Sequence, residues 1–336
     1  MKVRELIGVL DDITGGRVIT DLDDVSTGKN PFVVIKSSNI PGKAVMETPG
    51  LVYGNPDAEI KKVAVAMTLT EGGIELAGAT GVNVIIAHHP IADAANSGGV
   101  TLKSYLDLYN ISVFELHEAF HGLHPGISYI HGHKPFHSDI RYGGIPGNIM
   151  YVGKTLDEVK TLGDILDRLN KMMDMDKENQ VMGSERIHFN CADMKDSATS
   201  VLGEILLGTK DSPVNTVLHI FPHTGFTAEH LEKAKSEYPE IDTVLATISR
   251  VKADSALVAK AKELGLNFIC GNSHALEIFE NGLPLAYALR HYLPEDIEIV
   301  IFRERICSTP LKDFGSQTIK DYAKFITENY LIHDKK

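Results

Sequence analysis

Two spacings of apolar residues alternate along most of the chain. Short runs rich in β-branched residues predict buried strands, and longer segments with apolar residues every three or four positions predict amphipathic helices. The predicted strands are 61–70, 82–87, 111–116, 215–221, 242–249, 267–271 and 298–305, and the predicted helices are 3–13, 71–81, 97–110, 156–175, 227–240, 254–266 and 274–293. This alternation predicts an α/β fold: two α/β lobes with mixed sheets flanked by helices.

Other segments lack a clear period. Residues 14–50 are rich in Gly, Asp, Ser and Pro and predict irregular structure, 118–145 is loop-like, and 176–213 is polar and ambiguous. Gly282 and Pro284 predict a bend in the helix at 274–293. We therefore expect an N-terminal α/β lobe at 1–145, a helical and loop-rich connection at 146–213, a C-terminal α/β lobe at 214–310 and a helical tail at 311–336.

Composition narrows the class of protein. With 336 residues, 43% hydrophobic and 23% charged, the chain is typical of a soluble globular protein of about two domains. A net charge of -12 argues against general nucleic-acid binding, which needs clustered Lys and Arg. The sequence has no apolar stretch long enough for a membrane helix, no export signal and no CxxC pair, so we expect a cytoplasmic protein.

Histidine is the unusual residue type. Eight of the 15 histidines fall between positions 88 and 137, and histidines follow four predicted strands at their carboxyl ends. They are His88 and His89, His117 and His121, His223, and His274. Ligands of open α/β sheets bind outside the carboxyl ends of the strands, so these side chains are expected to converge on one site.

The spacing of these residues indicates metal ligation. His117 and His121 would share one face of a helix, as would His274 and Glu277. Imidazole together with carboxylate suits zinc, iron or manganese, and we expect one or two divalent ions per chain. The predicted ligands are His88, His89, His117, His121, His274 and Glu277. By contrast, His131, His133 and His137 in HGHKPFH are interpreted as a solvated loop.

Three functions fit these residues. In a metal-dependent hydrolase acting on a small molecule, Glu118 or His223 beside the ligands would serve as general acid or base. In a metal-binding or regulatory protein, the same ligands would hold metal without catalysis. In an assembly scaffold, hydrogen bonds alone would satisfy the histidines.

The sequence also resembles a known family along most of residues 1–295. The segment GLVYGNPDAEIKKVAVAMTLTEGGIELAGATGVNVIIAHHPI (50–91) is similar to the opening block of the YbgI-like, or Nif-three-like, dinuclear metal-binding proteins. ISVFELHEAFHGLHPG (111–126), LHIFPHTG (218–225) and TVLATIS with LGLNFICGNSHALE (243–277) resemble its later blocks in order. These proteins are often described as homologues of the type two GTP cyclohydrolase.

The resemblance implies two α/β lobes with a metal pair in the cleft, a toroidal homohexamer, and a nucleotide or pterin-like small substrate. His88 and His89 match the paired ligands of the family, and Glu277 matches its closing carboxylate.

Three positions depart from the family pattern. His121 stands where the family has Asp, Ser273 stands where it has a histidine, with His274 one place later, and Thr68 stands where it has Asp. Losing a bridging carboxylate favours a single zinc as an alternative to a metal pair. Side chains that could replace the missing ligands are His117, His223 and Asp93.

Overall fold

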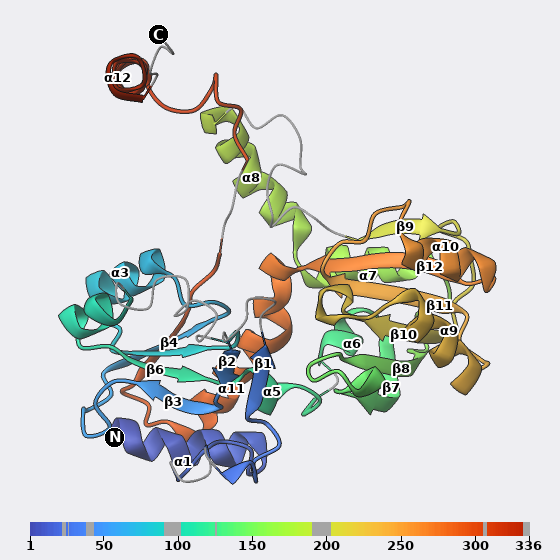
Figure 1. The fold of residues 1–336 in the computed structure, drawn as a ribbon, viewed down its shortest axis with the longest axis horizontal. Coiled ribbons are helices and arrows are strands. Elements are labelled where there is room, and N and C mark those ends of the chain that lie inside the picture. Colours follow the sequence, from blue (N-terminus) through green and yellow to red (C-terminus); the bar gives the residue numbers. More distant parts are fainter. Residues whose placement is uncertain are drawn as a thin grey trace. The chain divides into compact units, whose positions relative to one another are not determined.

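In the computed structural model of the chain, the described residues are 1–331 without 22–24, 26, 38–43, 91–101, 125, 190–202 and 305–307. The chain forms two compact units (Figure 1), of which the first comprises Met1–Met173 and Leu202–Glu304, and the second comprises Asp174–Val201 and Arg305–Lys336. The first unit contains two lobes, each built on one large sheet.

The N-terminal lobe is built on a five-stranded sheet with the order β13-β4-β5-β6-β3. Its strands are β3 (Gly50–Tyr53), β4 (Lys62–Ala66), β5 (Val84–Ala87), β6 (Ser112–Glu115) and β13 (Glu298–Ile301). Strands β13, β4, β5 and β6 run parallel, and β3 runs antiparallel to β6. A separate antiparallel pair is formed by β1 (Val34–Ser37) and β2 (Ala44–Glu47).

Helices cover both faces of this sheet, and its middle strand β5 is apolar and buried at every position. The helices are α1 (Val3–Thr14), α3 (Glu71–Thr80), the helical residues 102–109, and α11 (Leu283–Tyr292). Val63 and Val65 of β4 pack into the core beneath α1 and α11, whereas Ala64 packs into the core beneath α3 and residues 102–109. Figure 1 shows α1 and α3 on opposite faces of the sheet. A parallel sheet buried on both faces is the expected outcome of such strands.

The C-terminal lobe is built on a six-stranded sheet with the order β7-β8-β10-β11-β12-β9. Its strands are β7 (His133–Asp139), β8 (Met150–Thr155), β9 (Glu204–Leu207), β10 (Thr216–Ile220), β11 (Thr243–Ile248) and β12 (Asn267–Ser273). Strands β10, β11 and β12 are parallel, and β8 and β9 pair antiparallel at the two sides of this core. Helices α9 (Ala228–Glu237) and α10 (Ala256–Glu263) pack on one face, and α7 (Leu162–Met172) contacts β12.

The chain passes twice between the two sheets. The first passage runs from β6 through α5 (His117–Phe120) and α6 (Gly126–Ile130) to β7. The second runs from β12 through a 3₁₀ turn (η5, His274–Leu276), a π-helical turn (η6, Ile278–Gly282) and α11 to β13. The predicted bend in the helix at 274–293 therefore lies where the π-helical turn meets α11.

The predicted fold class is confirmed, but several segments differ from the sequence-based expectation. Residues 14–50 were expected to be irregular, yet β1, β2 and the start of β3 lie there. The strand predicted at 298–305 pairs with β4 of the N-terminal lobe, and β7 belongs to the C-terminal sheet. Strands β1, β2 and β3 have four residues each, too few to give a clear period, and a local pattern does not show which strands pair.

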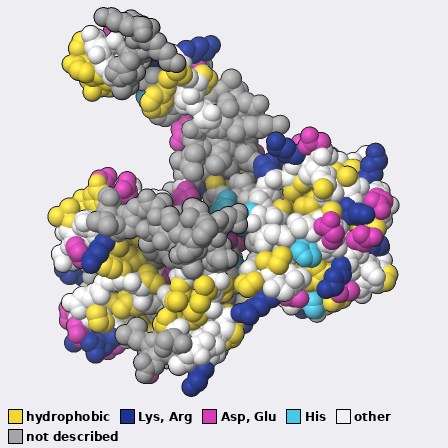
Figure 2. All heavy atoms as spheres, in the orientation of Figure 1, with side chains coloured by type: hydrophobic (Ala, Val, Ile, Leu, Met, Phe, Trp, Pro, Cys, Tyr) yellow, Lys and Arg dark blue, Asp and Glu magenta, His cyan; other side chains and the backbone are white. Residues whose placement is uncertain are grey.

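The second unit is helical in its described residues. It contains α8 (Met175–Phe189), α12 (Gln317–Ile326) and a π-helical turn at Thr327–Leu331. Among the described residues, no helix combines the length and the apolar character that crossing a membrane requires. On the face of the molecule drawn in Figure 2, Lys and Arg side chains are interspersed with Asp and Glu.

The interpretation of HGHKPFH as a solvated loop was wrong. His131 and His133 are fully buried, and they lie beside the equally buried His219 of β10. His133 Nε2 lies 3.0 Å from His219 Nδ1, and His219 Nε2 lies 2.7 Å from Thr247 Oγ1. The backbone N–H of Asn272 donates to His131 Nε2 at 3.1 Å. Because polar residues are frequent in this segment, the sequence pattern did not reveal β7, a strand in which more buried and more exposed residues alternate.

Burial keeps these imidazoles uncharged. It lowers the pKa of His131 to about 4 and that of His133 to about 3, and it lowers the pKa of His219 well below its ordinary value. In the unfolded chain a histidine titrates near pH 6.5. Below that pH the unfolded state therefore binds protons that the folded state excludes, and stability falls as the pH drops toward the folded pKa values.

We therefore expect the free energy of unfolding to decrease steeply between pH 6.5 and about 4. Each buried imidazole contributes a slope of about 1.4 kcal/mol per pH unit in this window. In a His133→Gln variant the slope should be shallower by about 1.4 kcal/mol per pH unit, measured by urea unfolding at several pH values. The control is His137→Gln, a change at a partly exposed position on the same strand. A slope in His133→Gln equal to that of the unmodified chain would contradict the prediction.

Candidate metal centre

Two adjacent histidines leave the carboxyl end of β5. The backbone N–H of His88 donates to the carbonyl of Ala66 at 3.1 Å, and that of His89 donates to Met67 at 2.7 Å. The pairing with β4 thus continues past the end of the strand and holds both residues at the sheet edge. The His88 side chain is buried, and that of His89 is partly exposed.

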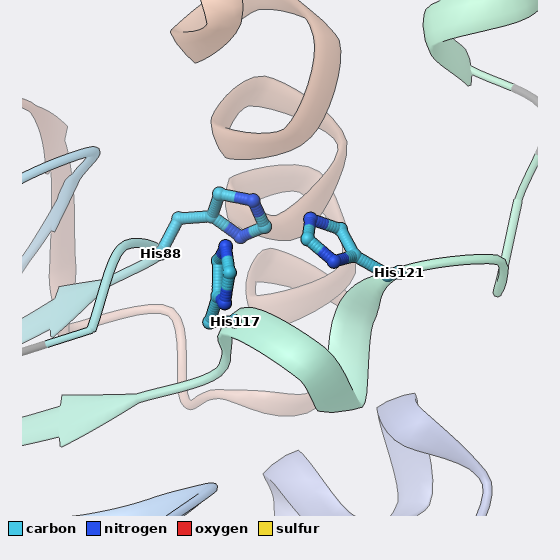
Figure 3. A group of neighbouring side chains, drawn as sticks. All are labelled: His88, His117 and His121. Atoms are coloured by element: carbon cyan, nitrogen blue, oxygen red, sulfur yellow. The ribbon is translucent and has the colours of Figure 1, made fainter. Parts of the chain in front are cut away.

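The short helix α5 brings two further histidines to this edge. His117 begins the helix, and His121 follows its last residue, with its N–H donating to the His117 carbonyl at 3.3 Å. Figure 3 shows the rings of His88, His117 and His121 pointing toward one another. Their ligand nitrogens all lie within 4.8 Å of one another, close enough to hold one metal ion.

A second group forms around the carboxylate of Glu277. Its Oε1 lies 3.3 Å from His88 Nε2, and its Oε2 lies 2.8 Å from His89 Nε2 and 3.6 Å from His274 Nε2. The Nε2 atoms of His89 and His274 are 2.9 Å apart. Zinc bonds of about 2.0–2.1 Å place tetrahedral ligands about 3.3 Å from one another. The spacing of these atoms therefore fits a cation at their centre.

The protonation states also suit metal ligation. Burial alone would raise the pKa of Glu277, but hydrogen bonds from His88 and His89 outweigh burial and hold this pKa well below its ordinary value. Burial lowers the pKa of His88 to about 4 and also lowers that of His274. Near neutral pH the site therefore offers an ionised carboxylate at Glu277 and uncharged imidazoles at His88 and His274, the forms that bind metals. The buried Nδ1 atom of His88 has no hydrogen-bond partner among the described residues.

Polar neighbours orient three of these side chains. His117 Nδ1 lies 2.9 Å from the buried carboxylate of Glu47, and His89 Nδ1 lies 3.0 Å from Thr68 Oγ1. With a metal bound at Nε2, each of these two imidazoles would carry its proton on Nδ1 and donate it to the neighbouring oxygen. Asn281, one helical turn after Glu277, donates from Nδ2 to Glu277 Oε1 at 3.0 Å.

All six residues predicted from the sequence as ligands lie in this region. They are His88, His89, His117, His121, His274 and Glu277. His223 lines the same cavity. Glu118 lies on α5, but its side chain is outside the described part of the structure, as is the whole of Asp93.

The sequence did not assign a role to the orienting residues. Asn281 could have been found from its i, i+4 spacing to Glu277 on a predicted helix. Thr68 was recognised only as a departure from the family pattern, and its contact with His89 depends on the pairing of β4 with β5. Glu47 lies in a segment that was expected to be irregular, so no sequence signal pointed to it.

Comparison with known proteins agrees with this fold. The chain is similar to reduced HcgD from Methanocaldococcus jannaschii, with a TM-score of 0.54 and 16% identity over 90% of this chain and 97% of that one. The chain is also similar to a Bacillus cereus protein related to NIF3, with a TM-score of 0.54 and 12% identity over 90% of this chain and 97% of that one. The similarity to the protein ybgI, of unknown function, has a TM-score of 0.52 and 13% identity over 90% of this chain and 98% of that one. No curated protein matches the chain.

The fold and the histidine and glutamate groups define an α/β protein with side chains that could hold a metal ion. A family model described as Duf34/NIF3 (NGG1p interacting factor 3) matches residues 36–188. The resemblance of the sequence to the Nif-three-like, or YbgI-like, family is thereby confirmed.

The contact between Thr68 and His89 leads to a prediction about metal affinity. We expect Thr68→Val to weaken zinc binding by about tenfold to a hundredfold, because the His89 imidazole loses the oxygen that fixes its orientation. Thr68→Ser keeps that oxygen and should bind zinc as the unmodified chain does. Competition with a chromophoric chelator measures both affinities. Equal zinc affinity in Thr68→Val and the unmodified chain would exclude an orienting role.

Proposed function

We propose that this chain is a metal-dependent hydrolase that acts on a small molecule and uses one or two divalent ions of zinc, iron or manganese. The observation that carries the proposal is the position of the two ligand groups. Members of both groups line one cavity of about 670 Å³. Pockets of this size are typical of small-molecule sites.

The composition of the two groups supports catalysis. His88, His117 and His121 supply three imidazoles, and His88, His89 and Glu277 supply two imidazoles and a carboxylate. These are the ligand sets of catalytic zinc sites, in which one coordination position stays open. A divalent cation held there would supply Lewis acidity toward a substrate oxygen and would make a water molecule more acidic. His88 belongs to both groups, and the metal content per chain distinguishes one bound ion from two.

His223 is our first candidate for the general base. Its backbone N–H donates to Ser249 Oγ at 3.1 Å, and its Nδ1 lies 3.2 Å from the same oxygen. Burial is the main cause that lowers the pKa of His223 to about 4, and the neighbouring His274 adds to this effect. The imidazole is therefore uncharged near neutral pH. An uncharged ring fixed at Nδ1 and lining the cavity can accept a proton at Nε2. Glu118 on α5 is the second candidate.

One observation favours a metal-binding or regulatory role without catalysis. His274 lies close enough to His89 and Glu277 to act as a further ligand. Four protein ligands around one zinc close its coordination, as in structural sites. Turnover therefore has to be tested separately from metal binding.

The substrate class rests on the family resemblance and on charge. We propose a small nucleotide or pterin-like molecule rather than a nucleic acid, since the chain carries a net charge of -12. We also propose a cytoplasmic location, because Cys191, Cys270 and Cys307 are far apart in the sequence and form no CxxC pair.

The test begins with metal content per chain, measured by elemental analysis on untagged protein purified without chelator. We expect one to two equivalents of a divalent metal and a loss of about one equivalent in His89→Ala, because that imidazole contributes to the second group. His137→Ala, which removes an imidazole from β7, should keep the full content. No metal even after soaking with zinc, iron and manganese would overturn the proposal.

Hydrolysis of p-nitrophenyl phosphate, bis(p-nitrophenyl) phosphate and p-nitrophenyl acetate is then measured on the metal-loaded protein. We expect turnover of at least one of these compounds, and a loss of about a hundredfold in His223→Ala at unchanged metal content. Metal binding without turnover of any ester would support the non-catalytic alternative. Full activity in His223→Ala would show that His223 is not the general base. Glu118 would then be the candidate, and Glu118→Gln tests it directly.

We also propose assembly into a homohexamer, on the family resemblance alone. Sedimentation velocity at micromolar concentration should give a single species of six chains. A stable monomer under these conditions would contradict the proposal.

A further inference from the structure

The cavity that contains the histidines has a second, apolar side. Five buried residues form a hydrophobic cluster that is separate from the cores of the two lobes, and we call it the apolar wall. Its members are Ile127, Ile149, Tyr151, Phe221 and Ile248. Every one of them also lines the cavity. A cluster that contributes to neither lobe core and faces a cavity throughout is suited to contact with a ligand.

The apolar wall is held rigidly by the C-terminal sheet. The Phe221 ring stacks on His219, with centroids 5.3 Å apart and planes 15° apart, and it meets the Tyr151 ring edge-on at 6.0 Å. His219 itself contacts His133 of β7 and Thr247 of β11. The buried imidazoles of this lobe therefore support an aromatic surface, against which a further ring can pack edge-to-face or offset.

Ile248 is placed in the wall at a conformational cost. Its φ of 66° is unusual for a β-branched residue, and the pairing of β11 with β12 shifts register between Ala246 and Ile248. Strained residues and bulges of this kind concentrate at binding sites. The bulge turns an apolar side chain into the cavity at the end of β11, where a regular strand would have continued its alternation.

The His124 side chain, which lines the same cavity, has a buried polar atom without a hydrogen-bond partner among the described residues. The backbone N–H of Gly126 donates to His124 Nδ1 at 3.0 Å, so the ring proton of His124 resides on Nε2. This Nε2 is buried, lacks a hydrogen-bond partner among the described residues, and belongs to a residue that lines the cavity. A Cβ atom at position 126 would come within 2.5 Å of His124 Nδ1, so the arrangement requires glycine there. A buried N–H donor without a partner calls for an acceptor from a ligand.

We infer that the cavity binds an aromatic compound that carries a metal-ligating oxygen group at one end and a hydrogen-bond acceptor on its ring. The oxygen group would face the histidine and Glu277 side, the ring would pack on the apolar wall, and the acceptor would receive the His124 Nε2–H. This inference rests on the proposed metal site and specifies the chemical class of the ligand. It assigns His124 a role in substrate recognition rather than in metal binding.

Hydroxamates of different size test the ring contact. Isothermal titration calorimetry on the zinc-loaded protein compares acetohydroxamate, which offers only the metal-ligating group, with benzohydroxamate, which adds a phenyl ring. We expect benzohydroxamate to bind about tenfold more tightly or better, because the ring buries apolar surface. Ile127→Ala should reduce this ratio by about threefold. Ile140→Ala is the matched control, because Ile140 packs against the same cluster without lining the cavity.

Two pyridine analogues test the donor. Nicotinohydroxamate and isonicotinohydroxamate place a ring nitrogen at two different positions, and we expect at least one of them to bind about threefold to tenfold more tightly than benzohydroxamate. His124→Phe, which keeps a ring but no donor, should abolish that gain and leave acetohydroxamate binding unchanged.

The outcomes separate this inference from the proposed function. Equal affinity for acetohydroxamate and benzohydroxamate would overturn the ring contact while leaving the metal site intact. No gain from either pyridine analogue would overturn the role of His124. Failure of every hydroxamate to bind would overturn the metal site itself. The comparison of hydroxamates on the unmodified chain decides the first point even if Ile127→Ala does not fold.

Discussion

The buried carboxylate of Glu277 is the constraint on which the site depends. Its side chain is only 5% exposed, and an isolated ionised carboxylate at such a position would be strongly destabilising. His88, His89 and Asn281 compensate it through contacts of 2.8–3.3 Å. Because the two histidines leave β5 and Glu277 lies between β12 and α11, this one contact ties the N-terminal sheet to the second passage between the lobes. Removing either histidine leaves a buried charge without its partner, so the ligand positions and the connection between the lobes are not independent.

The second passage is irregular where Glu277 lies. A 3₁₀ turn and a π-helical turn precede α11, and Glu277 lies between them. π-helical turns change which residues share a helix face, and they recur at functional sites. His274, Glu277 and Asn281 stand at i, i+3 and i+7, a spacing that keeps them in the same region, and α11 continues into the core against α1 and β4. The irregular segment that carries the site residues and the regular helix α11, which packs in the core, therefore follow each other directly in one crossover between the two sheets.

The sequence was sufficient for the elements whose pattern is local. The strand cores β4, β5, β10 and β11 were predicted within a few residues, because each is a continuous apolar run with a clear end. The convergence of the candidate ligands could be predicted in a similar way, because each follows a predicted strand and the carboxyl ends of parallel strands meet at one edge. What the pattern could not supply was pairing between distant segments. The position of β13 beside β4, the strand β7, and the contact of Glu47 with His117 all depend on tertiary partners that no local period encodes.

The sequence-based interpretation of the histidines in HGHKPFH failed because it, too, lacked information on tertiary partners. Residue type does not distinguish an imidazole that offers a lone pair to a ligand from one that completes a buried hydrogen-bond network. His133 and His219 belong to the second kind, since they bond to each other, and His219 also bonds to Thr247. His88 is a candidate for the first kind, with a buried Nδ1 that has no partner among the described residues. The buried network supports the ring of Phe221, which lines the same cavity as Glu277. A rigid wall facing a set of converging lone pairs restricts the orientation of a bound ring, and that restriction is what would make such a site selective.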